Sequence, residues 1–314
     1  MTERRRLASI ASMTDPGQLA VHDRSPADTA VLAADAAARC AGVEIRELTD
    51  RGGFELACRL FDQIWAPTAG DASSSPKQLR ALAKAGGYVC GAFDASGLVG
   101  ASIGMFAAPA ERALYSNITA VADRVRGRQV GFALKLHQRA WALLRGVDTI
   151  CWTYDPLVRR NAHFNLAKLA AVPAEYLPNF YGPMRDAING TDETDRLLVR
   201  WQLAAPTVAS AATGQLQSID AGQELAQGAA VALSVADDGG PLLGRQDGAI
   251  VLVGIPADIE GLRMADSDCA SRWRLAVRDV LGTLLARQAR VIGFDRDGWY
   301  AVATARTTQR KDTE

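Results

Sequence analysis

The sequence predicts a mixed α/β fold in which helices cover both faces of a central sheet. Segments with alternating apolar and polar residues predict strands, and segments whose apolar residues recur every three to four positions predict helices. Their order is strand, hairpin, strand, and then strand–turn–helix–strand–helix–strand. This order is typical of a mixed sheet between two helical layers.

The composition is that of a globular protein without net charge. The 314 residues include 35 Lys and Arg against 35 Asp and Glu. This length gives two average domains or one large one, with ample apolar material for a core. The balanced charge argues against a nucleic-acid partner, which normally binds a basic surface. The chain shows no apolar run of roughly 18 residues, so we expect no membrane partner.

Cysteine and histidine usage predicts a protein without a metal site. The five cysteines are scattered singly without a Cys-x-x-Cys pair, and His22, His137 and His163 show no ligand spacing. Single cysteines are typical of a reducing compartment. The first residues, 1–18, lack the apolar core of a secretory signal. We therefore expect a cytoplasmic protein.

Four segments are expected along the chain. Residues 1–41 lack a clear period and predict a disordered leader with at most one marginal helix near 27–39. Residues 42–204 form the main domain. The composition becomes small and polar at 205, and we interpret 205–248 as a linker with edge strands. Residues 249–314 predict a strand–helix–strand–strand unit that is too small to fold alone and docks on the first sheet.

The main domain begins with a strand over 42–48 and a helix over 51–66. The segment 73–87 predicts a second helix, with a serine cap, a proline in the first turn and glycines at its end. Two strands, 88–94 and 98–106, form a hairpin around a short Ala-Ser-Gly turn.

The rest of the main domain holds the turn that carries the functional signal. It predicts a strand, a turn, a helix, a strand, a helix and a strand over residues 112–122, 125–130, 131–145, 148–154, 159–171 and 195–203. The C-terminal unit predicts a strand from 249, an amphipathic helix over 267–288 and a hairpin about 295–298.

The turn predicts an anion site. It leaves a strand and opens a helix, where ligands bind in open α/β sheets and where free N–H groups suit a phosphate. Gly127 and Gly131 let the backbone approach an anion, and Arg126 and Arg128 add positive charge. The turn is neither a Walker loop nor a three-glycine dinucleotide fingerprint. A nucleoside triphosphate and NAD are therefore disfavoured as ligands. A pyrophosphate that belongs to a different cofactor is the remaining candidate.

This turn resembles the coenzyme A signature of the GCN5-related N-acetyltransferase (GNAT) superfamily, Gln/Arg-x-x-Gly-x-Gly/Ala. Arg128-Gln-Val-Gly131-Phe-Ala133 satisfies it. A second register from Arg126 to Gly131 has Gln129 where a glycine is usual, and we leave the two registers open. The order of elements over 43–201 also resembles the superfamily. Residues 152–171 are similar to a bacterial subgroup of predicted acyltransferases.

The resemblance implies a GNAT-like sheet and an acyltransferase that moves an acetyl or larger acyl group from acyl-CoA to a small-molecule amine by direct attack. It implies a pyrophosphate site at Arg126, Gly127, Arg128, Gln129, Val130, Gly131, Phe132 and Ala133. Pantetheine would lie beside the strand before the turn, near the backbone amides of Ile118, Ala120 and Val121. One of these amides would polarise the acyl carbonyl.

The sequence departs from the family at the general acid. The resemblance aligns Leu166 with the family's tyrosine, and leucine cannot donate a proton. Tyr154, at the end of the strand 148–154, is the preferred substitute. His163 and Tyr181 are second choices.

For the general base the candidates are Asp155, His163 and Glu175, acting directly or through water. Asp155 also has a structural interpretation, because Asp before proline forms turns. The aromatic segment 173–183 either walls the acceptor pocket or seals the sheet edge.

A second class of function stays open at this point. Without the family's tyrosine, the chain could be a non-catalytic acyl-CoA-binding or regulatory module that keeps Arg126, Arg128 and Gly131. A homodimer is also left open.

Overall fold

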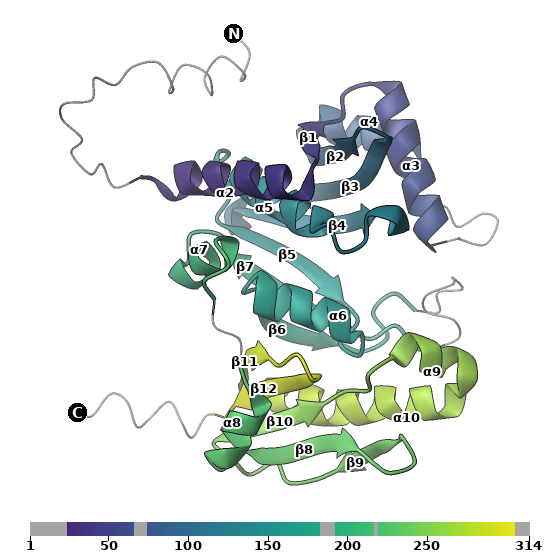
Figure 1. Ribbon diagram of the computed structural model, residues 1–314, viewed down its shortest axis with the longest axis vertical. Helices are drawn as coiled ribbons and strands as arrows, with labels where there is room; N and C mark the ends of the chain where they lie inside the picture. The colour runs from purple at the N-terminus through teal and green to yellow at the C-terminus, as the bar shows by residue number, and fades with distance from the viewer. Residues whose placement is uncertain (1–23, 66–73, 183–191, 217–218, 305–314) are drawn as a thin grey trace.

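Two β-sheets organise the chain in a computed structural model that describes residues 24–65, 74–182, 192–216 and 219–304 (Figure 1). The larger sheet has seven strands in the order β1-β2-β3-β4-β5-β7-β6. These strands are β1 (Glu44–Glu47), β2 (Tyr88–Asp94), β3 (Gly97–Phe106), β4 (Ala113–Val121), β5 (Thr149–Tyr154), β7 (Arg196–Gln202) and β6 (Val172–Leu177). Strands β4 and β5 are parallel and the other described neighbours are antiparallel. The predicted mixed α/β sheet is confirmed.

Helices cover both faces of this sheet, as the sequence predicts. On one face, α3 (Arg51–Trp65) and α4 (Pro76–Lys84) pack on an apolar cluster that includes Ile103 of β3. A capping box between Ser75 and Gln78 fixes the start of α4. The helices on the other face are α5 (Val130–Leu143), α6 (Arg159–Ala162) and the π-helix η3 (His163–Lys168).

In the predicted leader, the helix expected to be marginal near 27–39 is a full helix, α2 (Pro26–Ala41), so the expectation of disorder is wrong for these residues. Ser25 caps the N-terminus of α2 by accepting from the Asp28 amide. Its buried side chains are alanines, Ala30 and Ala34 among them, and they let α2 lie close against α5 (Figure 1). An alanine stripe gives little hydrophobic contrast, so the periodicity is weak in the sequence. Residues 1–23 lie outside the described part.

The predicted linker, 205–248, is also more ordered than expected. It contains α7 (Pro206–Ala212), α8 (Ala221–Ala226), β8 (Ala230–Val235) and β9 (Pro241–Leu243). In the second sheet, of order β11-β12-β10-β8-β9, β9 is an edge strand as expected, but β8 is an inner one. Small residues such as Ala232 fill its buried positions, which gave this segment the composition of a linker.

The C-terminal unit shares one apolar core with the first domain. It contains β10 (Ile250–Gly254), α9 (Ile259–Ala265), α10 (Ser267–Val277), the π-helix η4 (Arg278–Gly282), α11 (Thr283–Ala286), β11 (Arg290–Phe294) and β12 (Trp299–Ala303). Trp273, Val277 and Leu284 belong to the same buried cluster as Trp152 and Val199 of the first sheet. The expected docking of this unit on the first sheet therefore agrees with the structure. No helix in the described ranges is long and apolar enough to cross a membrane.

Candidate acyl-CoA site

Strands β4 and β5 separate soon after they begin to pair. Their parallel pairing runs from Ala113 opposite Thr149 to Tyr115 opposite Cys151, whereas β4 continues to Val121. An irregularity sits in β4 at this point: Gly104 of β3 faces Ser116, and the preceding β3 residue faces Ile118. Asn117 is thus an extra residue, a β-bulge of the kind that bends a strand and ends pairing. The second half of β4 therefore has no strand paired on its β5 side, and we refer to this unpaired edge as the gap.

The backbone groups that face this gap differ from the predicted ones. Ala122 donates its N–H to Val99 O of β3 at 2.9 Å. Backbone groups point alternately to either side of a strand. Ala120 and Ile118 therefore direct their amides to β3, and Thr119 and Val121 direct theirs into the gap. The amides of Ile118 and Ala120, which the resemblance implied for the cofactor, therefore face β3 and not the gap. The Val121 amide faces the gap, and so does that of Thr119, which was not among the predicted residues.

At the far end of β4 the chain makes the turn that the sequence singles out. Gly127 has φ +85° and Gln129, the residue before α5, has φ +66°. The structure shows no side-chain cap on α5, whose first amides from Val130 to Phe132 lack an intrahelical acceptor. A Cβ added at Gly131 would meet only Val121 Cγ2, at 3.6 Å. The helix start is thus open, donor-rich and uncapped, which suits a phosphate.

The two arginines of the turn have different surroundings. Arg128 donates to Asp94 Oδ2 at 2.8 Å and to Ala41 O and Gly42 O at 3.1 and 3.2 Å, so it ties the turn to the end of α2. Arg126 is exposed and pairs with its neighbour Asp123. A further cation at the turn is Lys168 of η3, which donates to Gln129 Oε1 at 3.3 Å.

Three hydroxyl groups meet where β4 and β5 part. Tyr181 OH lies 3.0 Å from Thr153 Oγ1 and 3.4 Å from Tyr115 OH, and Tyr115 OH lies 3.5 Å from Thr153 Oγ1. Burial raises the pKa of Tyr115 to about 12. We refer to these residues as the hydroxyl cluster. Of the three residues, only Tyr181 was predicted from the sequence.

The chain around Tyr181 is held by residues just before β7. Thr194 Oγ1 accepts from the Tyr181 amide at 3.1 Å and donates to Gly182 O at 2.8 Å. Asp195 accepts from the Asn179 amide at 2.9 Å and from Tyr176 OH at 2.7 Å. The aromatic segment is thus partly strand β6 at the sheet edge and partly a pinned turn that brings Tyr181 to the hydroxyl cluster. Of the two alternatives, the sealing of the sheet edge agrees with the structure, and a role as a wall of the acceptor pocket stays a prediction.

The position of Tyr154 conflicts with its predicted role in proton donation. Its ring lies on the opposite face of β5 from Thr153 and is buried in the core shared by the two domains. Its hydroxyl lies 3.4 Å from Tyr300 OH of the second sheet. Burial raises the pKa of Tyr154 well above the ordinary value for tyrosine. We therefore assign Tyr154 to the domain interface.

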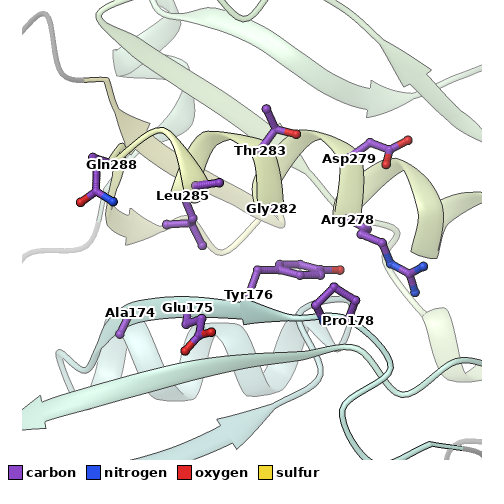
Figure 2. A pocket seen from close by; sticks show the side chains of 11 residues that line it. Ala174, Glu175, Tyr176, Pro178, Arg278, Asp279, Gly282, Thr283, Leu285 and Gln288 are labelled. Carbon is purple, nitrogen blue, oxygen red and sulfur yellow. The ribbon is translucent and has the colours of Figure 1, made fainter.

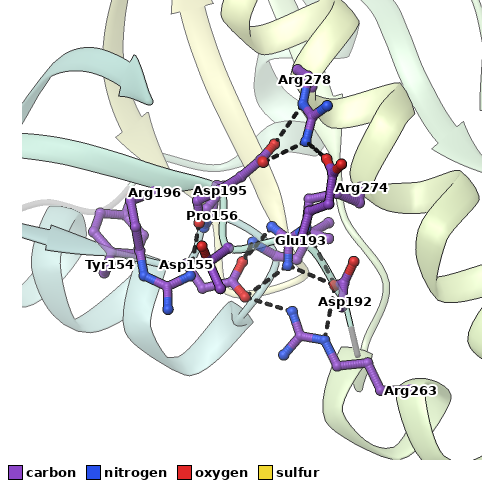
Figure 3. Close-up of polar contacts among 12 residues, drawn as sticks. Tyr154, Asp155, Pro156, Asp192, Glu193, Asp195, Arg196, Arg263, Arg274 and Arg278 are labelled. Atoms are coloured by element: carbon purple, nitrogen blue, oxygen red, sulfur yellow. Dashed lines mark hydrogen bonds and ion pairs between the residues drawn. The ribbon is translucent and has the colours of Figure 1, made fainter. Parts of the chain in front are cut away.

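Asp155 likewise belongs to the domain interface. It accepts from Arg274 at 2.8 and 2.9 Å and from Arg263 at 2.5 Å (Figure 3). Burial raises the pKa of Asp155, but these guanidinium groups lower it more, so the net shift is downward. The predicted role of general base is inconsistent with a carboxylate that already binds two arginines.

His163 and Glu175 lie away from the hydroxyl cluster. His163 is half-buried at the start of η3, and burial, with Lys168 and Arg296 nearby, lowers its pKa. Glu175 of β6 lines a separate groove of about 530 Å³ between β6 and the helical stretch η4–α11 (Figure 2). Among the residues that the structure describes, no group of three or more His, Cys, Asp or Glu side chains could hold a metal ion.

The protein is similar to known proteins in its structure, whereas sequence comparisons give no match. No protein-family profile matches the sequence, and no curated protein matches it. Similar solved structures include an N-acetyltransferase from Staphylococcus aureus Mu50, with 13% identity, 51% of this chain and 98% of that chain covered, and a TM-score of 0.44. An IAA acetyltransferase from Bacillus cereus ATCC 14579 has 14% identity, coverage of 51% and 99%, and a TM-score of 0.39. An aminoglycoside 6'-acetyltransferase type Ii has 17% identity, coverage of 51% and 97%, and a TM-score of 0.40. These similarities span about half of the present chain.

Proposed function

We propose that the protein transfers an acyl group from acyl-CoA to the amine of a small molecule. The observation that carries the proposal is the gap between β4 and β5 together with the uncapped start of α5 at its far end. The gap offers the free amides of Thr119 and Val121 to an extended, amide-containing chain such as pantetheine. The helix start offers N–H groups and partial positive charge to the pyrophosphate.

The chemistry proposed for this site needs no covalent enzyme intermediate. The amine nitrogen attacks the thioester carbonyl, the nitrogen–carbon bond forms and the carbon–sulfur bond breaks. A gap-facing amide stabilises the developing charge on the carbonyl oxygen, as in an oxyanion hole. The hydroxyl cluster lies where the strands part and supplies hydrogen bonds that orient the acceptor.

Gly131 provides the test of the cofactor site. We expect Gly131→Asp to abolish the thermal shift that acetyl-CoA gives the wild type, because a carboxylate would lie beside the pyrophosphate. Ligand stabilisation follows RT ln(1 + [L]/Kd), so the lost shift reports lost affinity. The free protein should stay folded, since a Cβ at Gly131 makes only an ordinary contact.

Ala108→Asp is the matched control. Ala108 is exposed at the other end of β4 and precedes a short turn whose N-terminus accepts an acidic cap. The Ala108→Asp substitution adds the same charge without touching the proposed site, so this variant should keep the full thermal shift with acetyl-CoA. A folded Gly131→Asp variant that acetyl-CoA stabilises as strongly as the wild type contradicts the site. Tight binding without turnover over a broad amine library would instead contradict the transferase activity.

A further inference from the structure

Lys135 of α5 is buried beneath the point where β4 and β5 part. Its side chain is 3% exposed. Its Nζ donates to Gln138 Oε1 at 2.8 Å and to Ser116 Oγ at 3.2 Å, and it lies 3.7 Å from the centre of the Trp152 ring. Ser116 directly follows Tyr115, the last residue of β4 that pairs with β5. The ammonium group therefore lies on the opposite face of the sheet from the hydroxyl cluster.

No carboxylate neutralises this ammonium group in the described part of the chain. Its contacts are a hydroxyl, an amide oxygen and an aromatic face, which stabilise a cation less than an ion pair does. Burying an unpaired charge is costly, and the amide nitrogen of Gln138 is itself buried without a partner. A protein that needed only a packed core here would be more stable with an apolar side chain.

The titratable groups around Lys135 do not bind its ammonium group. Titratable or charged side chains on the elements packed on this face include His137 and Arg139 of α5, Tyr88 and Cys90 of β2, Tyr154 of β5, Arg159 and Arg160 of α6, and His163 and Lys168 of η3. None of them donates to or accepts from Nζ: His137 binds Tyr88, and Arg139 binds Leu203 O. Burial alone lowers the pKa of Lys135 to about 7.

Ser116 lies between this ammonium group and the point where β4 and β5 part. Its backbone groups face β5 where pairing ends, and its Oγ touches Lys135 Nζ. Leu166 of η3, which belongs to the apolar cluster on this face, has no proton to give. A hydroxyl backed by an ammonium can relay a proton to a base that forms beside it.

We propose that Ser116 protonates the thiolate that leaves from acyl-CoA and that Lys135, a positioning residue behind it, resupplies the proton. This inference rests on the proposed function. When the carbon–sulfur bond breaks, its electron pair stays on sulfur. Sulfur then takes the hydroxyl proton of Ser116, and Ser116 takes one from the Lys135 ammonium. The proton that the attacking amine releases to solvent restores the ammonium.

Two single variants and their combination test the relay. Lys135→Met removes the charge at nearly constant length, and Ser116→Ala cuts the connection. Each should lower kcat about tenfold to a hundredfold, at or below the lower limit of the usual range of about a hundredfold to ten-thousandfold for positioned proton transfer, since a thiolate leaves readily. The double variant should be no slower than the slower single one, because both residues serve one path.

The pH profile separates this role from a structural one. Wild-type kcat should fall as the pH rises through about 7, where Lys135 loses its proton, and Lys135→Met should lack that limb. A second readout needs no acceptor: ultraviolet absorbance gives the pKa of the thiol in bound CoA. The wild type should hold that pKa below its value for CoA free in solution, and Lys135→Met should not.

The outcomes distinguish the relay from the proposed function. An unchanged thiol pKa and pH profile in a folded Lys135→Met protein that still binds CoA would overturn the relay alone. The relay would also be overturned if the losses in kcat of the two single variants added up in the double variant. A wild type that CoA does not stabilise at all would overturn the proposed function, and the relay with it.

Discussion

Single side chains decide the chemistry of the gap between β4 and β5. Tyr115, Thr153 and Tyr181 form a hydroxyl cluster on one face, and Lys135 with Ser116 forms a polar pair on the other. The resemblance placed the cofactor beside the strand before the turn, but these groups could not be predicted from the sequence, because residue spacing does not reveal which face of a bulged strand a side chain occupies.

The hydroxyl cluster should affect acceptor use more than cofactor binding. We expect Tyr181→Phe to raise KM for the amine about threefold to thirtyfold, about the loss of one or two hydrogen bonds, with little change in acyl-CoA affinity. Steady-state kinetics in which both substrates are varied measures the two KM values separately. Tyr154→Phe is the control, since Tyr154 faces the domain interface. An equal loss in both variants would contradict the assignment of the cluster.

At the scale of elements, the start of α5 depends on its connection to α2 and β2. Arg128 joins the turn to the last carbonyls of α2 and to Asp94. The order of elements in the main domain could be predicted because caps, glycine turns and periodicity all agreed there. Helix α2 and strand β8 could not, since their buried positions are mostly small residues, whose role appears only against a partner.

The Asp94–Arg128 pair gives a pH dependence of stability. Hydrogen bonds from Ser96 and Arg128 lower the pKa of Asp94 to about 2, below its unfolded value of about 3.9. A lowered carboxyl pKa stabilises the fold above the unfolded value, and this contribution is lost as the pH falls through the folded value. We expect Asp94→Asn to lower the midpoint of urea unfolding at pH 7 and to differ less from the wild type near pH 2. A constant difference across this range would contradict the linkage.

At the scale of the whole molecule, buried ion pairs join the two domains. Arg274 is 2% exposed and bridges Asp155 of the first domain to Asp192 (Figure 3). Arg278 binds Glu193 and Asp195, and Asp195 holds the turn that carries Tyr181. The second domain thus supports one wall of the candidate site. The docking could be predicted from the small size of the C-terminal unit, but this network could not, because Asp155 and Arg274 are far apart in the chain.

Loss of Arg274 should destabilise the whole protein. Removing one partner of a buried pair commonly costs about 3–5 kcal/mol, because a charge stays buried without its counterion. We expect Arg274→Met to lower the free energy of unfolding by this amount, as measured by urea denaturation. Arg245→Met, in an exposed pair with Asp247, is the control and should cost under about 1 kcal/mol. Similar losses in the two variants would show that the network is not an important connection between the domains.

Amide hydrogen exchange with and without acetyl-CoA tests the central claim most directly. If the cofactor lies in the gap with its pyrophosphate on α5, exchange should slow at Thr119, Val121, Val130 and Gly131. Ile118 and Ala120, whose amides already face β3, should change little. Protection that appears elsewhere, or equally at all residues of β4, would contradict the placement of acyl-CoA between β4 and β5.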